Sequence, residues 1–295
     1  MRNHIPFTKM EGLGNDYVYV NGFEVNLPDP ASVARAISDR HFGVGSDGLV
    51  LILPSAVADV RMRMFNSDGS EAEMCGNASR CVGKYVYEHG LVIKPVIRLE
   101  TKAGIKVLHL IFEHDEVVGA RVDMGEPELA AGRIPVQTGL DAALPQEHEH
   151  VINKTRMIDG QAWEITAVSM GNPHAVTFVD DVDALNLPQL GAAFEHHSFF
   201  PKRVNTEFVQ KLSPSHVRMR VWERGAGETL ACGTGACATV VACVLTGQCE
   251  RRVRVDLLGG SLDIEWNEKD NHVYMTGAAR TVFDGIYHFT EDCKP

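Results

Sequence analysis

Two cysteines, Cys75 and Cys232, are the residues of this sequence best suited to acid–base chemistry. Each precedes a glycine and a segment of helical periodicity, so each is predicted to begin a helix. The backbone N–H groups and the positive end of a helix dipole favour a thiolate there over the ordinary thiol pKa of about 8.5. Such a group can remove or return a proton. The alternative is a pair of inert core thiols, because cysteine is among the most buried residue types.

An internal duplication relates these two cysteines. They lie 157 positions apart (232 − 75). Other segments repeat at that offset, namely Arg61-Met62-Arg63 with Arg218-Met219-Arg220, Glu71 with Glu228, Gly90 with Gly247, and Gly14-Asn15 with Gly171-Asn172. A gapless offset along so much of the chain indicates a structural repeat. Because Cys-Gly persists in both copies while the surrounding residues differ, we expect both thiols to be functional.

Two thiols on opposite sides of one bound molecule could invert a carbon centre without a cofactor. One thiol would remove a proton and the other would deliver one. The backbone N–H groups of Gly76-Asn77 and Gly233-Thr234, at the two predicted helix N-termini, would bind a carboxylate. This chemistry requires the two halves of the chain to face each other across a cleft.

Composition limits the class of partner. The chain has 295 residues, 44% hydrophobic and 23% charged, which suits two globular domains. A net charge of -11 argues against nucleic acid and anionic membranes, so we expect a small-molecule partner.

The first residues lack the apolar core of a signal peptide, and no stretch reaches the length of a membrane span, which predicts a cytoplasmic protein. The seven cysteines are expected to be thiols there, and neither Cys75/Cys81 nor Cys232/Cys237 has C-x-x-C spacing.

The remaining pattern predicts the elements that position the cysteines. In the first half, helices are predicted at 30–40 and 76–89, among strands at 49–53, 60–65, 96–99, 105–112 and 117–124. The second half repeats this plan, with helices near 185–195 and from 232 to 247, among strands at 163–168, 175–179, 205–210 and 217–223. Arg80, Lys84 and Glu88 are predicted on the polar face of the first cysteine's helix. The second cysteine's helix is apolar on nearly every face, so a sheet should wrap it.

We therefore predict an α/β (α+β) fold. It has two pseudo-symmetric domains from an internal duplication, each a curved β-sheet wrapped around a central helix, with the active site in the interdomain cleft. The N-terminal half spans 1–127 and is completed by 281–295, because a last strand crosses back to it. The C-terminal half spans 128–280.

Several long motifs resemble those of diaminopimelate epimerase. They are Gly12-Leu13-Gly14-Asn15-Asp16, Phe65-Asn66-Ser67-Asp68-Gly69, Cys75-Gly76-Asn77, Ser169-Met170-Gly171-Asn172-Pro173-His174, and Glu223-Arg224-Gly225-Ala226-Gly227-Glu228-Thr229. The resemblance implies interconversion of LL- and meso-2,6-diaminopimelate in lysine and cell-wall precursor synthesis. It further implies that neither pyridoxal phosphate nor a metal takes part. We also expect a homodimer.

The resemblance assigns roles to individual residues. Cys75 and Cys232 fall on the two catalytic thiols of the family, and the implied polarity makes Cys232 the base and Cys75 the acid from LL to meso. The positions that contact substrate are matched by Asn15, Asn66, Asn172, Asn205, Glu223 and Arg224. His174 and Glu223 fall on positions that tune the thiols. Arg224 suits a distal carboxylate through its bidentate fork, and Glu223 suits an ammonium.

Less specific interpretations compete with these roles. Each Asn could be a turn residue beside glycine, Glu223-Arg224 an exposed pair, and His174 a loop histidine. His148-Glu149-His150 and His196-His197 could suggest a metal, but no Cys or carboxylate constellation completes a site. Two departures from the family pattern stand out. Gly48 replaces a substrate-contacting glutamine of some members, and Ala78-Ser79 replace the usual Gly-Ala or Gly-Ile.

Three other functions stay open from the sequence. A proline or hydroxyproline racemase has the same fold but binds a ring without a distal amino-acid head, which the run from Glu223 to Glu228 argues against. A phenazine-biosynthesis-like isomerase would lack the cysteine pair. A thiol-exchange protein would cycle Cys75 and Cys232 through a disulfide, which the absence of C-x-x-C disfavours.

Overall fold

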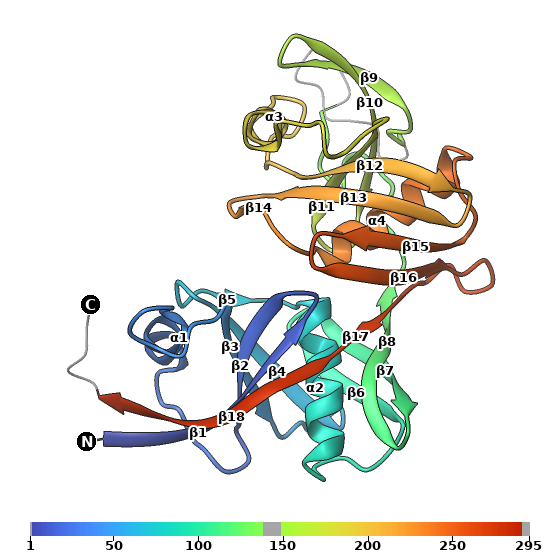
Figure 1. The fold of residues 1–295 in the computed structure, drawn as a ribbon. Helices are drawn as coiled ribbons and strands as arrows, with labels where there is room; N and C mark the ends of the chain where they lie inside the picture. Colours follow the sequence, from blue (N-terminus) through green and yellow to red (C-terminus); the bar gives the residue numbers. More distant parts are fainter. Residues whose placement is uncertain (1, 138–148, 291–295) are drawn as a thin grey trace. The chain divides into compact units, whose positions relative to one another are not determined.

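The computed structural model describes residues 2–137 and 149–290. The chain divides into two compact units: residues up to Asp123 together with those from Thr276 onward form unit 1, and Met124–Met275 form unit 2. The last strand, β18 (Arg280–Thr290), belongs to unit 1, where it pairs antiparallel with β1 (Arg2–Gly12). The first unit is thus completed by the C-terminal end of the chain (Figure 1).

Unit 1 is a curved sheet around a central helix. Its other elements are β2 (Asn15–Asn21), α1 (Pro30–Ser38), β3 (Gly48–Leu53), β4 (Val60–Asn66), β5 (Glu71–Ala72), α2 (Gly76–Glu88), β6 (Val96–Thr101), β7 (Gly104–Glu113), β8 (Glu116–Gly125) and the end of β17 (Val273–Ala278). The strands pair in the order β18, β1, β2, β3, β4, β6, β7, β8, and β8 also pairs with β17. Because β17 leads directly into β18, the sheet curls round. Helix α2 packs against β1, β2 and β7.

Unit 2 repeats this plan. It contains β9 (Lys154–Ile158), β10 (Gln161–Ser169), β11 (Pro173–Phe178), α3 (Leu187–Glu195), β12 (Asn205–Ser213), β13 (His216–Glu223), β14 (Gly227–Glu228), α4 (Gly233–Leu245), β15 (Arg252–Leu257) and β16 (Gly260–Trp266). The strands pair in the order β9, β10, β11, β12, β13, β15, β16, and α4 packs against β10, β11, β12, β15 and β16. The apolar helix is wrapped by sheet, as its composition predicts.

The duplication is confirmed at the level of the elements. Helices α1 and α3 begin at Pro30 and Leu187, and α2 and α4 begin at Gly76 and Gly233, so both pairs keep the offset of 157 (187 − 30 and 233 − 76). In each unit the shorter helix connects two strands that pair in parallel: α1 connects β2 and β3, and α3 connects β11 and β12. The longer helix then crosses between β4 and β6, or between β13 and β15, which also pair in parallel.

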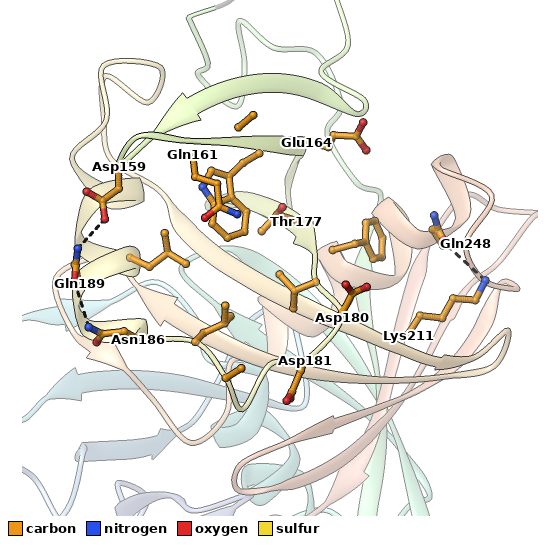
Figure 2. A pocket seen from close by; sticks show the side chains of 17 residues that line it. Asp159, Gln161, Glu164, Thr177, Asp180, Asp181, Asn186, Gln189, Lys211 and Gln248 are labelled. Atoms are coloured by element: carbon orange, nitrogen blue, oxygen red, sulfur yellow. Dashed lines mark hydrogen bonds between the residues drawn. The ribbon is translucent and has the colours of Figure 1, made fainter.

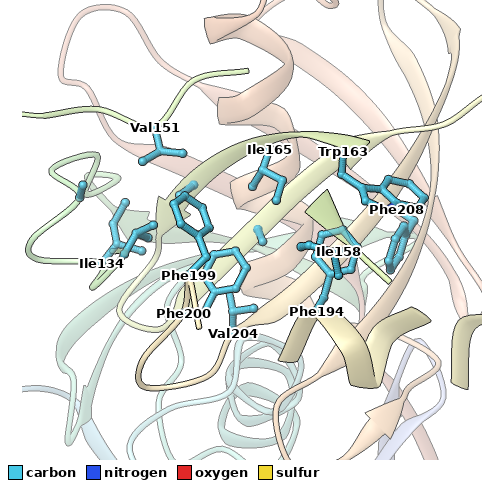
Figure 3. Packing of buried hydrophobic residues seen from close by; sticks show 14 of the residues in the cluster. Ile134, Val151, Ile158, Trp163, Ile165, Phe194, Phe199, Phe200, Val204 and Phe208 are labelled. Carbon is cyan, nitrogen blue, oxygen red and sulfur yellow. The ribbon is translucent and has the colours of Figure 1, made fainter. Parts of the chain in front are cut away.

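An aromatic cluster holds the sheet of unit 2 against α3. Trp163, Phe194 and Phe208 come from β10, α3 and β12, and their rings meet edge to face with centroids 5.3–5.9 Å apart (Figure 3). Because side chains alternate along a strand, Phe208 on the cluster side places Glu207 and Asn205 on the opposite face of β12. That face packs against α4, the helix that begins after Cys232.

The backbone around Gly48 leaves no room for a side chain. A Cβ atom there would lie 2.0 Å from the carbonyl oxygen of Phe65 and 2.8 Å from the ring of Tyr17. Gly48 is paired with Asn66 in the ladder between β3 and β4, so the obstacle is a strand backbone. The glutamine of some family members therefore cannot be accommodated here without separating these strands.

We predict that Gly48→Gln lowers the free energy of unfolding by about 2–3 kcal/mol, because the strand backbone must shift. Thermal unfolding followed by circular dichroism measures this. Gly160→Ala is the control, because a Cβ at Gly160 meets nothing within 4 Å and only the positive φ of 77° is strained. Its cost should be about 1 kcal/mol. Unchanged unfolding of the Gly48 variant would contradict the steric argument.

Candidate active site

In unit 1, Cys75 lies directly before the helix predicted from the sequence. It is the N-cap residue of α2, with extended backbone angles and no capping hydrogen bond from its side chain. Its Sγ donates to Asn15 Oδ1 at 3.4 Å, and Asn77 Nδ2 donates to the same oxygen at 3.4 Å. Three predicted site residues, from β2, the N-cap and the first turn of α2, therefore form one hydrogen-bonded group.

Two residues missed in the sequence hold this group in place. Asp47 Oδ2 accepts from Asn15 Nδ2 at 2.7 Å, and Asp47 Oδ1 forms an ion pair with Arg40 Nη2 at 3.1 Å. Arg80 donates to Asn77 Oδ1 at 3.0 Å and to the carbonyl of Ala278 at 3.0 Å. The prediction that Arg80 lies on a polar helix face is wrong, because the side chain is fully buried inside the curved sheet. For Asp47 the signal was its place within the glycine-rich turn of residues 43–48.

Asn66 lies at the end of β4, opposite Gly48. Its Nδ2 donates to Ser70 Oγ at 2.9 Å, and its backbone N–H donates to the carbonyl of Ser70. The side chain is thus held by the β4–β5 turn.

In unit 2, Cys232 is likewise the N-cap residue of its helix, α4, but it is almost completely buried. Its Sγ lies 3.5 Å from Thr234 Oγ1. Burial raises the pKa of the Cys232 thiol well above its usual range, and the carboxylates of Glu223 and Glu207 raise it further. The expected stabilisation of a thiolate by the helix N-terminus is therefore outweighed at this cysteine. The surroundings of Cys232 therefore favour the protonated thiol.

Glu223, the last residue of β13, accepts a short hydrogen bond from Thr229 Oγ1. Burial raises the pKa of its carboxyl group, and the Glu207 carboxylate adds to this, whereas Thr229 and His174 oppose it. Glu223 and Cys232 interact electrostatically, and the assignment of Glu223 as a tuning residue stays a prediction.

His174 lies between two oxygen acceptors. Its Nδ1 is 2.7 Å from Glu207 Oε1, and its Nε2 is 3.0 Å from Asn172 Oδ1. His174 and Glu207 are both fully buried, so this is an interior pair and not a loop contact. Glu207 was missed in the sequence, although a charged residue within the apolar run of β12 is a signal that it has a partner.

Arg224 lies in the turn after β13 with an exposed side chain and a fixed backbone. Its N–H donates to Asn205 Oδ1 at 2.8 Å, and Asn205 Nδ2 donates to the carbonyl of Pro173 at 3.0 Å. The next N–H, that of Gly225, donates to the buried Glu195 at 3.0 Å. Asn205 thus ties the Arg224 turn to the strand that carries His174.

A separate cavity of unit 2 lies away from these residues. A cavity of about 930 Å³ opens between the β9–β10 hairpin, the end of β11 and α3, and its polar lining includes Asp159, Glu164, Asp180, Asp181 and Lys211 (Figure 2). None of the predicted site residues lines it.

Within the described ranges, no group of three or more His, Cys, Asp or Glu is arranged to hold a metal ion, and His148 lies outside those ranges. No described helix is long and apolar enough to span a membrane.

Solved structures of several other proteins share the fold of this chain. A probable proline racemase from Agrobacterium radiobacter aligns with a TM-score of 0.70 at 15% identity, covering 98% of this chain and 93% of that one. A Bacillus anthracis protein of the PhzF phenazine-biosynthesis family aligns with a TM-score of 0.67 at 17% identity, covering 96% of this chain and 99% of that one. A hydroxyproline epimerase from Agrobacterium vitis aligns with a TM-score of 0.66 at 15% identity, covering 97% of this chain and 91% of that one. The chain therefore has the two-domain fold shared by these proteins.

Sequence comparison narrows this to one family. The profile described as diaminopimelate epimerase matches residues 7–130 and 166–282. Proteins of that name from Desulfovibrio desulfuricans and Acetivibrio thermocellus are 63% and 58% identical over 284 and 285 residues, covering 96% and 97% of this chain and 98% and 99% of theirs. One from Methanococcus maripaludis is 57% identical, covering 95% of this chain and 99% of its own. The chain belongs to the diaminopimelate epimerase family and is an isomerase.

We predict that Asp47→Asn lowers kcat/KM of the epimerisation roughly tenfold, because a hydrogen bond to a charged group is exchanged for a weaker neutral one. Asp59→Asn is the matched control. Its carboxylate also binds a backbone N–H and a cation, those of Arg98 and Lys94, but it is not hydrogen-bonded to the Cys75 group. Equal effects of the two substitutions would show that Asp47 does not support Asn15.

Proposed function

We propose that the chain interconverts LL- and meso-2,6-diaminopimelate with Cys75 and Cys232 as the two acid–base groups. One observation carries this proposal: two thiols occupy the N-cap positions of equivalent helices, one in each repeat. Neither side chain caps its own helix. The membership of the epimerase family supports the choice of substrate.

The helix N-termini supply the binding site for the reacting carboxylate. The N–H groups of Gly76-Asn77 and Gly233-Thr234 lie in the first turns of α2 and α4, beside the two sulfurs. Such groups bind an anion and stabilise the negative charge that develops as the α-proton leaves. The reaction then needs no cofactor, because inversion requires only removal of a proton from one face and delivery to the other.

The distal amino-acid head of the substrate is assigned to the Arg224 turn. A guanidinium binds a carboxylate through two parallel hydrogen bonds, and the Asn205 contact fixes the backbone from which Arg224 projects. Asn15, Asn66, Asn77 and Asn172 offer amide groups to the ammonium and carboxylate groups. We place the reaction in lysine and cell-wall precursor synthesis in the cytoplasm, carried out by a homodimer.

The two directions of the reaction start from opposite protonation states. With Cys232 held as a thiol by its carboxylates, the chain begins ready to donate a proton from Cys232. Under the predicted polarity this form converts meso to LL. Conversion of LL to meso starts from the form in which Cys232 is the thiolate.

We expect Cys75→Ala and Cys232→Ala each to lower epimerisation of LL-diaminopimelate by roughly 10²–10⁴-fold, since each removes one proton-transfer group. Circular dichroism of the isomer mixture follows the reaction. Cys81→Ala is the control: this thiol is in α2 as well, but burial raises its pKa to about 11 and it should not take part. Near wild-type activity of either N-cap variant would refute the two-thiol assignment.

We also predict that Arg224→Lys raises KM for diaminopimelate roughly tenfold or more, because lysine keeps the charge but loses the planar fork. Steady-state kinetics with LL-diaminopimelate, and separately with proline, test this. Proline lacks the distal head, so the wild type should not prefer it. An unchanged KM, or a preference for proline, would favour the racemase alternative.

A further inference from the structure

Glu207 is a buried carboxylate that the proposed mechanism does not use. It lies on β12, is fully buried, and its Oε1 binds His174 Nδ1 at 2.7 Å. Its other oxygen, Oε2, has no hydrogen-bond partner among the described residues. A buried carboxylate with one unsatisfied oxygen is costly, so its retention calls for a role.

Gly235 brings this carboxylate next to the reactive sulfur. A Cβ atom at Gly235, in the first turn of α4, would lie 2.6 Å from Glu207 Oε1 and 3.2 Å from Cys232 Sγ. Only a glycine allows the Glu207 carboxylate and the Cys232 thiol to share the space beside the helix N-terminus. The contact is therefore built into both β12 and α4.

His174 completes the arrangement. Its two ring nitrogens face a carboxylate oxygen of Glu207 and the amide oxygen of Asn172. Each ring nitrogen therefore has one oxygen partner within hydrogen-bond distance. The Glu207 carboxylate thus holds the ring toward Asn172, a residue assigned to substrate binding.

We propose that Glu207 is a positioning residue that orients His174 and, through its charge beside the first turn of α4, keeps Cys232 protonated until substrate binds. The ionisable groups around this thiol are Glu207 from β12, Glu223 from β13 and His174 from β11. The two carboxylates act in the same direction on the thiol. The role in turnover rests on the proposed function, whereas the effect on the thiol does not.

Glu207→Gln separates this role from packing. Glutamine has the same shape and can still accept from His174 Nδ1, so a purely structural role predicts little change. Loss of the charge should lower the pKa of Cys232, and we expect its thiolate fraction to increase about tenfold at a fixed pH below that pKa. Because a less basic thiolate is also less nucleophilic, we expect alkylation of Cys232 by iodoacetamide to become about threefold faster or more.

Peptide-resolved mass spectrometry of the intact, folded protein measures this rate for Cys232 without any substrate. Glu195→Gln is the control, because Glu195 is another buried carboxylate of unit 2 that binds Trp222 and Gly225 instead. Its Cys232 rate should stay at the wild-type value. In turnover, Glu207→Gln should move the alkaline limb of the kcat/KM profile about one pH unit lower, with KM changed less than twofold.

If Glu207→Gln does not fold, Gly235→Ala displaces the same carboxylate with a residue that favours helix, and it should also speed alkylation of Cys232. An unchanged alkylation rate in the folded variant, or an equal change in Glu195→Gln, overturns the proposal. Faster alkylation in a protein that does not epimerise diaminopimelate would instead refute the proposed function and leave the role of Glu207 intact.

Discussion

The burial of the Cys232 thiol against carboxylates is the interaction on which this account depends. A helix N-terminus alone would favour a thiolate, and two identical N-termini would give two equivalent sulfurs. Burial together with Glu223 and Glu207 reverses that preference at Cys232. An inversion by two groups needs one protonated and one deprotonated member at the start, so a difference between the repeats is a requirement of the chemistry.

The two repeats share one fold but surround their cysteines with different groups. Equivalent helices begin at Gly76 and Gly233, yet the surroundings of the two cysteines have diverged. Around Cys75 the partners are amides, supported by Asp47 and the buried cation of Arg80. Around Cys232 lie the carboxylates of Glu223 and Glu207, together with the hydroxyl of Thr234. The apolar α4 and the aromatic cluster behind β12 hold those charges in an interior where they act strongly.

The sequence predicted the repeated elements well because periodicity and the constant offset are local signals. It also predicted the family and both N-cap cysteines, which short motifs define. It missed Glu207 and Arg80 because burial of a charge depends on contacts between distant segments: β12 with α4 for the first, and α2 with β17 for the second. A helical wheel placed Arg80 with Lys84 on a polar face, but the curved sheet surrounds that face at Arg80.

The most direct test is turnover of LL-diaminopimelate in deuterium oxide, with the α-hydrogens of substrate and product followed from the earliest conversion. If one thiol removes the proton and the other delivers its own, the new meso isomer carries deuterium at the inverted carbon. The remaining LL substrate should still carry protium. A product that retains the substrate's protium, or LL substrate that gains deuterium as fast as the product forms, would show that a single group works on both faces and would contradict the account.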